Sequence, residues 1–352
     1  MYYSKIGVAK FGLTNQIFSF INSIIIAYKN NEKVVIVDNF LDDFSKQNYT
    51  PISKIFNINK INIFLKKTYD IIIIDKYDVN LKINSIKYGT VDNNVDLTDY
   101  IIQNYYKNNV LCIKKDINFN SIKGDPCLNI KKNVFLNYTI NDYLIDEIYQ
   151  EILTNNISID ILNSEYKNTF DWINTYDKIM FENILINIYY NIDFIEKSKN
   201  ILQKIDINKK INVIHLRIED DAIQHWSKMN NMSMINFKTY IENKYINLIQ
   251  KFISKTDENI ILSHSINNNV VNFLKKNNYS CHFNEKYFED REKNAIIDLI
   301  TTNYCNNIFI GNFNFKKLNG STFSYYIGKR LNNNIKKICI DLDKIYDNAM
   351  II

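Results

Sequence analysis

An arginine that directly follows a buried strand is the residue in this sequence best suited to chemistry. The apolar run Val213–Leu216, interrupted only by His215, follows the polar segment Asn208–Lys210 and ends at Arg217. A short apolar run bounded by polar residues is typical of a buried strand. In open α/β sheets ligands bind beyond the carboxyl ends of the strands, so we expect Arg217 to lie in a binding site.

Arginine is scarce in this chain, which makes each one informative. Among 43 Lys and Arg residues, only Arg217, Arg291 and Arg330 are arginines. A guanidinium binds phosphate through two parallel hydrogen bonds, which a lysine cannot form. The alternative is a salt bridge at the strand end between Arg217 and Glu219 or Asp221, and the motif alone does not decide between the two.

A second candidate anion site is the segment Gly320–Ser324, which opens a predicted helix running towards Leu331. Free backbone N–H groups at a helix N-terminus, with the hydroxyls of Ser321 and Thr322 beside them, bind anions. The alternative is a plain helix cap, because Ser and Thr are preferred there for structural reasons. Together with an arginine at a neighbouring strand end, the segment predicts a diphosphate site that needs no metal.

Other chemistries have less support. The four histidines, His215, His225, His264 and His282, show no HxxxH spacing and there is no CxxC pair, so we expect no metal. The G-x-S-x-G elbow of hydrolases and the G-x-G-x-x-G dinucleotide fingerprint are both absent, and no cofactor is expected. The lysines are scattered among 38 acidic residues with a net charge of +5, so nucleic acid is not an expected partner.

The N-terminal part reads as a βαβ unit. Strand Ser4–Ala9, a turn at Gly12, a buried helix over Ile17–Tyr28 and strand Lys33–Val37 follow one another within forty residues, and this order predicts a parallel sheet. Thr14 or Asn15 is expected to cap the helix. A further strand is expected at residues 71–74. Residues 97–201 read as mostly helical, for example residues 140–153 and 181–201.

The C-terminal part repeats the α/β alternation after the polar stretch Asp206–Lys210, which is the best domain break. The expected strands are Asn259–Leu262, Tyr279–Phe283, Ile308–Ile310 and Ile338–Ile340, and the expected helices are Phe237–Phe252, Val270–Lys276 and Asn294–Cys305. A chain of 352 residues is long enough for two domains. We therefore predict an α/β protein with two Rossmann-like domains, residues 1–205 and 206–352, facing across a cleft.

The sequence also bears on location. The first twelve residues lack the sections of a signal peptide, and the apolar stretch Ile17–Tyr28 is shorter than the ~20 residues that cross a bilayer. The five cysteines are odd in number and widely spaced, as expected of free thiols in a reducing compartment. We expect a cytoplasmic protein without a membrane anchor.

Three segments, taken together, resemble motifs of the fucosyltransferase superfamily. Ile214–Ile218 (IHLRI), followed by Asp220 or Asp221, resembles its HxR motif, especially that of protein O-fucosyltransferases. Gly12–Gln16 (GLTNQ) resembles its N-terminal G-x-x-N-Q. The second block of the superfamily is matched by Asp298-Leu299, Cys305, Ile308–Gly311 and the STFS of residues 321–324. The segments occur in the family's order over residues 12–330.

The resemblance implies a GT-B fold and a metal-independent, inverting transfer from a GDP-sugar, most often GDP-fucose, to a hydroxyl acceptor. Arg217 would hold the β-phosphate and offset the charge that grows there as the glycosidic bond breaks. His215 would position the arginine or touch the donor. Donor contacts are also expected at Asp221, Asp298, Ser321, Thr322 and Phe323. Asn15 would lie across the cleft, by the reacting carbon.

The sequence departs from the family pattern at two places. The glycine of the HxR loop is replaced by Glu219 or Asp220, and Asn307 stands where protein O-fucosyltransferases carry an aspartate that reads guanine. His264 and Ser265, at a strand end, are therefore expected as further contacts for the nucleotide. The general base is open among Asp38, Asp42 and Asp43.

Two alternatives remain open. One is a GT-B enzyme with another nucleotide sugar, and the other is a carbohydrate-binding or scaffold protein that has lost catalysis. The acceptor, whether glycan, protein or small molecule, carries no motif in residues 40–205, and the sequence does not name it.

Overall fold

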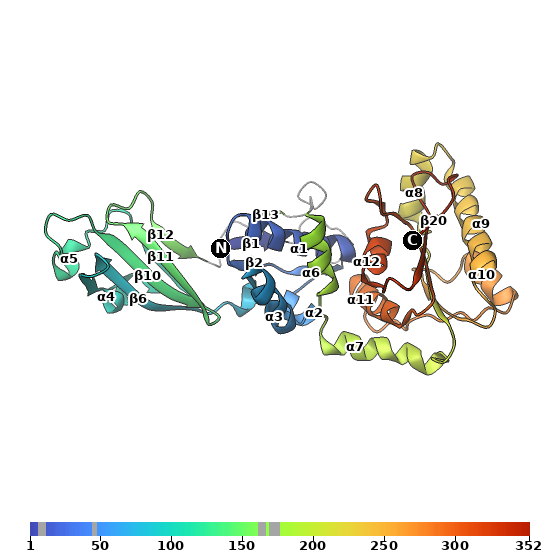
Figure 1. Cartoon of the computed structure of the whole chain (residues 1–352), viewed down its shortest axis with the longest axis horizontal. Coiled ribbons are helices and arrows are strands. Elements are labelled where there is room, and N and C mark those ends of the chain that lie inside the picture. Colours follow the sequence, from blue (N-terminus) through green and yellow to red (C-terminus); the bar gives the residue numbers. More distant parts are fainter. Residues whose placement is uncertain (6–11, 44–47, 161–166, 169–176) are drawn as a thin grey trace.

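The computed structural model describes residues 1–5, 12–43, 48–160, 167–168 and 177–352. Three bodies follow one another along the longest axis of the molecule: an antiparallel β lobe, a first parallel sheet with its helices, and a second parallel sheet with its helices (Figure 1). Across these described residues, we find no helix with the length and apolar character needed to span a bilayer. All five cysteines are free thiols, as the sequence predicted.

The first sheet is entirely parallel. Its strands, in the order β13-β1-β2-β5, are β13 (Lys167–Asn168), β1 (Tyr2–Lys5), β2 (Val34–Val37) and β5 (Ile72–Asp75). Helix α1 (Leu13–Lys29) connects β1 to β2, and 13 of its 17 residues are buried, which confirms the predicted buried helix. The later part of the predicted first strand, Ile6–Ala9, lies outside the described residues.

A glutamine fastens α1 to the segment that follows β2. This segment contains β3 (Phe40–Asp43), β4 (Asn48–Thr50), α2 (Ile52–Ile55) and α3 (Ile58–Tyr69). The Nε2 of Gln16 donates to the carbonyl of Leu41 at 2.7 Å, and the N–H of Leu41 donates to Oε1 of Gln16 at 2.7 Å. Both residues are buried, so water cannot reach the backbone N–H and C=O of Leu41, and the side-chain amide of Gln16 supplies their hydrogen-bond partners.

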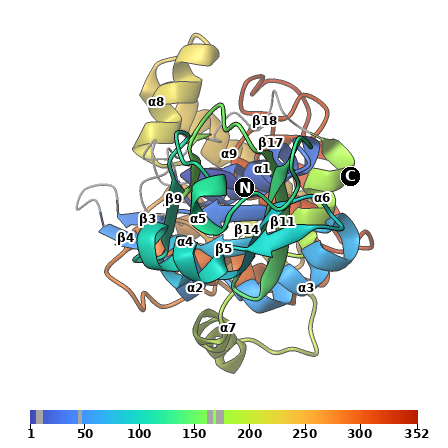
Figure 2. The same cartoon turned by 90° about the vertical axis from the view of Figure 1, so that its left-hand side faces the viewer.

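The β lobe corrects the sequence analysis, which expected helices in this part of the chain. Its main sheet, seen from its own side in Figure 2, has the order β11-β10-β6-β7 and is antiparallel. The strands of the main sheet are β6 (Leu81–Gly89), β7 (Asn94–Asp96), β10 (Asn133–Ile140) and β11 (Tyr143–Gln150). A smaller sheet contains β8 (Tyr106–Lys107), β9 (Val110–Ile113) and β12 (Ile157–Asp160). The lobe also contains helices α4 (Thr98–Tyr105) and α5 (Asn120–Lys123).

The predicted helix at residues 140–153 is therefore wrong: the region is a hairpin. Asn141 and Asp142, with φ of 48° and 65°, form the two-residue turn between β10 and β11, a turn that needs positive φ at both positions. The exposure of β11 alternates residue by residue, as on a strand with one covered face.

The lobe packs on the first sheet opposite α1. Along β2, Val34 and Ile36 belong to the apolar core of the lobe, whereas Val35 and Val37 pack in the core that contains α1. The strand is thus covered on both faces, which explains its unbroken apolar run.

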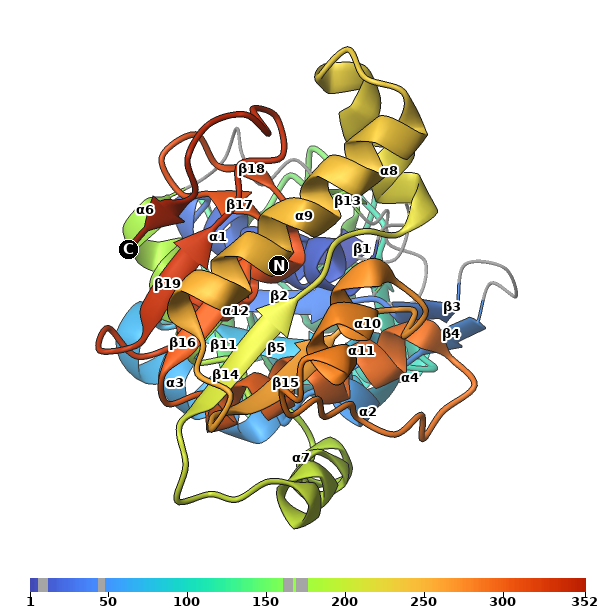
Figure 3. The ribbon, with the colours of Figure 1, turned by 90° about the vertical axis from the view of Figure 1, so that its right-hand side faces the viewer.

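The second sheet has the order β15-β14-β16-β19-β20 and carries the strand that leads to Arg217 (Figure 3). The strands β14 (Ile211–His215), β15 (Glu258–Leu262), β16 (Ile308–Gly311) and β19 (Lys336–Cys339) are parallel, and β20 (Met350–Ile351) is antiparallel to β19. The predicted strand at residues 279–283 is reduced to a single bridge between His282 and Ile260.

Helices cover both faces of the second sheet. The outer face packs against α8 (Asp220–Met229), α9 (Met234–Phe252) and α10 (Asn269–Lys276), and the inner face against α11 (Arg291–Thr301) and α12 (Thr322–Arg330). The 3-10 turn η3 (Thr302–Tyr304) extends α11. The acidic residues Asp220 and Asp221, which follow Arg217, begin helix α8.

One apolar core joins the two parallel sheets. It runs from α1 and α6 (Lys178–Ile186) to α11 and α12, while α7 (Ile192–Lys199) packs on α11. Arg330 of α12 donates to the carbonyls of Leu185 and Ile188 at 2.8 and 3.0 Å, at the end of α6. The predicted boundary between residues 205 and 206 divides the chain between the two sheets, but one apolar core contains residues from both sides of it.

Gln16→Ala tests the fastening of α1. The substitution leaves the buried N–H and C=O of Leu41 without partners, and we expect the free energy of unfolding to fall by about 2–4 kcal/mol. Urea unfolding monitored by circular dichroism measures this loss. Gln150→Ala, at the exposed end of β11, serves as the control and should change stability by less than about 0.5 kcal/mol. Equal midpoints for the two variants would contradict this account of Gln16.

Candidate active site

A cavity with a volume of about 590 Å³, within the range of small-ligand sites, is formed by residues of both halves of the chain. It lies where α1 begins, beyond the carboxyl ends of β14 and β15, and against the first turns of α11 and α12. Its wall includes Gly12, Leu13, Thr14, Asn15, His215, Arg217, Glu219, Asp221, Trp226, Ser263, His264, Asp298, Ser321, Thr322 and Phe323. Residues from both halves of the chain therefore form one pocket.

The turn after β14 is held by a tyrosine. The Oη of the fully buried Tyr245, on α9, donates to the carbonyl of His215 at 2.7 Å and accepts the N–H of Arg217 at 3.3 Å. Burial raises the pKa of Tyr245, which stays a neutral hydroxyl. Tyr245 therefore fixes the backbone of His215 and Arg217 from α9, while their side chains line the pocket.

Arg217 forms the strand-end salt bridges that were the alternative to phosphate binding, and it also lines the pocket. Its guanidinium contacts Glu219 and Asp221, each at 2.8 Å, and its side chain is 20% exposed. Burial lowers the pKa of Arg217, but the two carboxylates outweigh burial, so the pKa lies above its usual value. The arginine stays charged and reaches the cavity.

His215 is neutral. Burial, followed by the positive charge of Arg217, lowers the pKa of His215 to about 3. Its Nδ1 lies 2.7 Å from Oγ of Ser324, and its ring lies 4.9 Å from the ring of Phe323. An uncharged imidazole thus stands beside the guanidinium.

The start of α12 is open to a ligand. Ser321 occupies the N-cap position without a cap hydrogen bond from its side chain, so it is not the plain helix cap of the alternative interpretation. No described residue accepts the N–H of Thr322 or Phe323, and such free donors bind anions. Gly320, which precedes the helix, has φ of +104°, and a Cβ there would lie 2.8 Å from the carbonyl of Asn312. Glycine at position 320 is therefore required for the backbone conformation that leads into α12.

The start of α1 meets α12 and α11 across the pocket. Thr14 and Thr322 join their hydroxyls at 2.9 Å, and the N–H of Leu13 donates to Oε2 of Glu292 at 2.7 Å. Glu292 thereby caps α1, and neither Thr14 nor Asn15 does, contrary to the prediction. Asn15 lies on the pocket wall, and its side-chain amide makes no hydrogen bond with another described residue.

Asp298, on α11, is a carboxyl group with an unusual pKa. Its Oδ1 accepts from Nδ2 of Asn284 at 2.7 Å, and no described residue donates a hydrogen bond to Oδ2. Burial raises the pKa of Asp298 to about 6, and the hydrogen bond from Asn284 opposes that rise. The residue lines the pocket.

Some predicted site residues are not brought to the pocket. Asp38 pairs with Lys76 at 3.6 Å and accepts its neighbour's N–H, because the chain turns away after β2. Asp42 is buried in an ion pair with Lys293 at 2.7 Å. The side chain of Asp43 lies outside the described residues.

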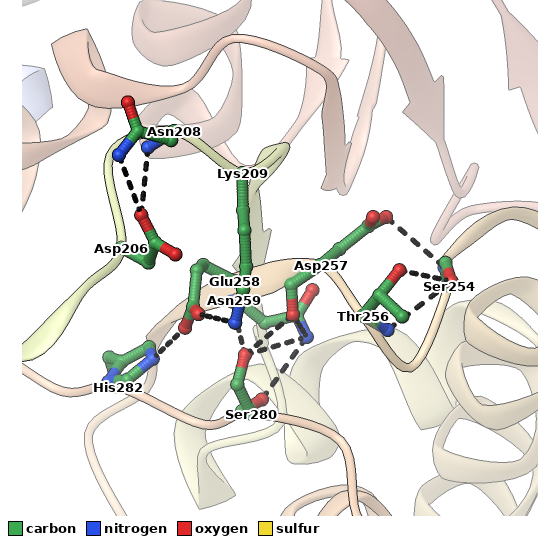
Figure 4. A network of polar contacts seen from close by, with 10 residues as sticks. All are labelled: Asp206, Asn208, Lys209, Ser254, Thr256, Asp257, Glu258, Asn259, Ser280 and His282. Atoms are coloured by element: carbon green, nitrogen blue, oxygen red, sulfur yellow. Dashed lines mark hydrogen bonds and ion pairs between the residues drawn. The ribbon is translucent and has the colours of Figure 1, made fainter.

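Asn307 and Ser265, which were expected to contact the nucleotide, are also absent from the lining of the pocket. Asn307 precedes β16 and donates to Asn212 at 2.7 Å, at the amino-terminal edge of the second sheet. The same edge holds the polar network of Figure 4, in which Glu258 contacts Lys209 and His282. Ser265 turns its hydroxyl to the N–H of Asn267 at 3.2 Å, whereas its neighbours Ser263 and His264 line the pocket.

Several residues of the site were missed because their signals are not local. Tyr245 and Asn284 reach the pocket region from segments that carry no motif, and Glu292 lies one residue after Arg291. Arg291 also lines the pocket, and the scarcity of arginine could have identified it. No group of three His, Cys, Asp or Glu side chains gathers as metal ligands within the residues that the structure describes.

Comparison with known proteins supports the fold. No family model and no curated protein sequence matches this chain. The crystal structure of POFUT1 in complex with GDP-fucose aligns with a TM-score of 0.50 and 11% identity, over 94% of this chain and 93% of that chain. The fucosyltransferase NodZ from Bradyrhizobium gives a TM-score of 0.48 and 11% identity, over 97% of this chain and 95% of that chain. The chain shares the fold of POFUT1, which confirms the predicted α/β fold of the GT-B type.

The raised pKa of Asp298 predicts a pH dependence of stability. The folded protein binds this proton more tightly than the unfolded chain, where an aspartate has a pKa of about 4, so wild-type stability falls as the pH rises from about 4 to 6. Asp298→Asn removes the effect and should be more stable than wild type at pH 7 by about 1–3 kcal/mol, with little difference below pH 4. Urea unfolding across this range measures it, with the exposed Asp116→Asn as control. A constant difference at all pH values would refute the assignment.

Proposed function

We propose that this protein is a glycosyltransferase that moves fucose from GDP-fucose to a hydroxyl of an acceptor. The observation that carries the proposal is that Arg217, the open start of α12 and Asn15 lie on the wall of one pocket. The likeness to POFUT1, solved with GDP-fucose, supports the choice of donor. Each of the three elements comes from a different part of the chain, and the fold brings all three to one cavity.

The diphosphate of the donor fits between Arg217 and α12. The guanidinium supplies a charge and two parallel donors, and the free N–H groups of Thr322 and Phe323 supply more, together with the hydroxyl of Ser321. These groups offset the negative charge that grows on the β-phosphate as the bond to the sugar breaks. The proposed reaction needs no metal for this purpose.

The base of the nucleotide fits at Asp298. A carboxylate accepts two hydrogen bonds from the N1–H and amino group of guanine, whereas uracil offers a single donor. Oδ2 of Asp298 is free for this role, and Asn284 holds the other oxygen. Asp298 thus takes the role that the sequence analysis gave to the position of Asn307. His264 and Ser263 stand at the neighbouring strand end for further contacts.

In the proposed reaction the acceptor binds on the side of the pocket that α1 forms. The acceptor oxygen attacks the anomeric carbon as the bond to the diphosphate oxygen breaks, the configuration inverts, and GDP leaves with the electron pair. Asn15 lies where it can bind the sugar or the incoming hydroxyl. Glu289 and Glu292 are carboxylates of the pocket wall, and a carboxylate can accept the hydroxyl proton.

A nucleotide panel tests the donor. GDP and GDP-fucose should raise the thermal midpoint in proportion to the logarithm of ligand concentration over Kd, and UDP should not. The shifts should persist with EDTA. Midpoint shifts with UDP alone would indicate another nucleotide sugar, and the absence of any shift would favour the non-catalytic carbohydrate-binding protein.

Arg217→Lys tests the mechanism. The lysine keeps a charge but loses the paired donors, and we expect kcat/KM for GDP-fucose to fall about 10²-fold or more while the fold persists. Transfer or hydrolysis of GDP-fucose, measured as released GDP, provides the assay. Arg330→Lys is the matched control: it changes an arginine outside the pocket and should lower stability more than activity. Turnover of Arg217→Lys near the wild-type value would remove Arg217 from the mechanism.

A further inference from the structure

We propose that Ser324 is a positioning residue that fixes the tautomer of His215, so that the imidazole presents an N–H donor at Nε2 to the pocket. The Ser324 hydroxyl makes two contacts, with Nδ1 of His215 at 2.7 Å and with the N–H of Asn312 at 2.8 Å. The inference deepens the proposed function, because it assigns a ligand donor beside Arg217, but its first test requires no ligand.

The direction of these two hydrogen bonds follows from their donors. The N–H of Asn312 can only donate, so Oγ of Ser324 accepts there. No other described group accepts the single hydroxyl hydrogen of Ser324, whose side chain is fully buried. A buried hydroxyl hydrogen without an acceptor is unfavourable, so the hydrogen goes to Nδ1 of His215. Nδ1 is thereby the acceptor nitrogen.

A neutral imidazole that accepts at Nδ1 carries its hydrogen on Nε2. The ring is neutral, because burial and Arg217 hold the pKa of His215 at about 3. No described residue contacts Nε2, and Nε2 is not among the enclosed polar atoms that lack a partner. Since His215 lines the pocket, the Nε2–H is open to it.

The surroundings leave this arrangement little freedom. A Cβ at Gly311 would lie 2.8 Å from Oγ of Ser324, so the glycine makes room for the hydroxyl. The Phe323 ring covers the imidazole at 4.9 Å, and Tyr245 holds the carbonyl of His215 at 2.7 Å. The strand end and the first turn of α12 therefore set one orientation of the ring.

An uncharged donor beside Arg217 suits a phosphate or hydroxyl oxygen of the nucleotide sugar. Because the ring stays neutral, it adds a hydrogen bond without a second positive charge, and its donor does not depend on pH in the neutral range. The final serine of the STFS segment thus acts on the ligand through His215, while Ser321 of the same segment faces the pocket itself.

Nitrogen-15 NMR of histidine-labelled protein tests the inference without ligand. His215 of the wild type should be a single neutral tautomer with hydrogen on Nε2, unchanged between about pH 5 and 8. His215→Asn assigns its signal among the four histidines. A ring protonated at Nδ1, or charged in that range, would overturn the inference, and this result does not depend on whether the variants below fold.

Ser324→Ala, with Ser321→Ala as matched control on the same helix, provides the second arm. We expect the Nε2–H tautomer of His215 to become a mixture in Ser324→Ala and to be retained in Ser321→Ala, each at a temperature where circular dichroism shows a folded protein. An unchanged His215 signal in folded Ser324→Ala would also overturn the inference.

Binding of GDP to the same variants separates this inference from the proposed function. If GDP binds wild type, Ser324→Ala should bind it about tenfold more weakly, and equal affinity would refute the role of Nε2–H as a ligand donor. Failure of GDP to bind wild type would reject the proposed donor while the tautomer result stands on its own.

Discussion

The side-chain hydrogen bond between His215 and Ser324 joins the two parts of the pocket that can bind an anion. His215 ends β14 and lies two residues before Arg217, whereas Ser324 lies in the first turn of α12, two residues after Thr322. The contact therefore holds a guanidinium and a helix N-terminus at a fixed separation. Tyr245 also holds the backbone of His215, and the N–H of Asn312 holds the hydroxyl of Ser324. The guanidinium and the start of α12 are therefore already ordered before a ligand binds.

The charge of Arg217 is balanced before any ligand arrives. A guanidinium that is only 20% exposed is costly to leave unpaired, and Glu219 and Asp221 supply its partners. The two carboxylates differ, because the side chain of Glu219 is 18% exposed and that of Asp221 is 65% exposed. Releasing Asp221 into water costs little. In the proposed function a diphosphate takes the place of Asp221, while Glu219 continues to orient the arginine.

The sequence predicted the parts of this site that are local in the chain. The apolar runs of β14 and β16 are buried on both faces, so their pattern is strong, and the residues just beyond β14 fall at the pocket by the geometry of parallel sheets. Asn307 was expected at the nucleotide from its place in the family motif, although it directly precedes the predicted strand Ile308–Ile310 and ligands bind beyond the opposite, carboxyl ends of such strands. The β lobe was missed because β11 has apolar residues on its exposed face as well as its covered face, which obscures the period of two.

The position of Asn15 depends on packing between the two halves rather than on its neighbours in sequence. Gln16, the next residue of the same helical turn, is buried and bound to Leu41, which fixes the rotation of α1 about its axis and leaves Asn15 on the pocket wall. The contacts Thr14–Thr322 and Leu13–Glu292 then fix the start of α1 against α12 and α11. Since one apolar core continues through these helices, a change in that core moves Asn15 relative to Arg217 without altering either residue. The distance between Asn15 and Arg217 is thus set by the shared core.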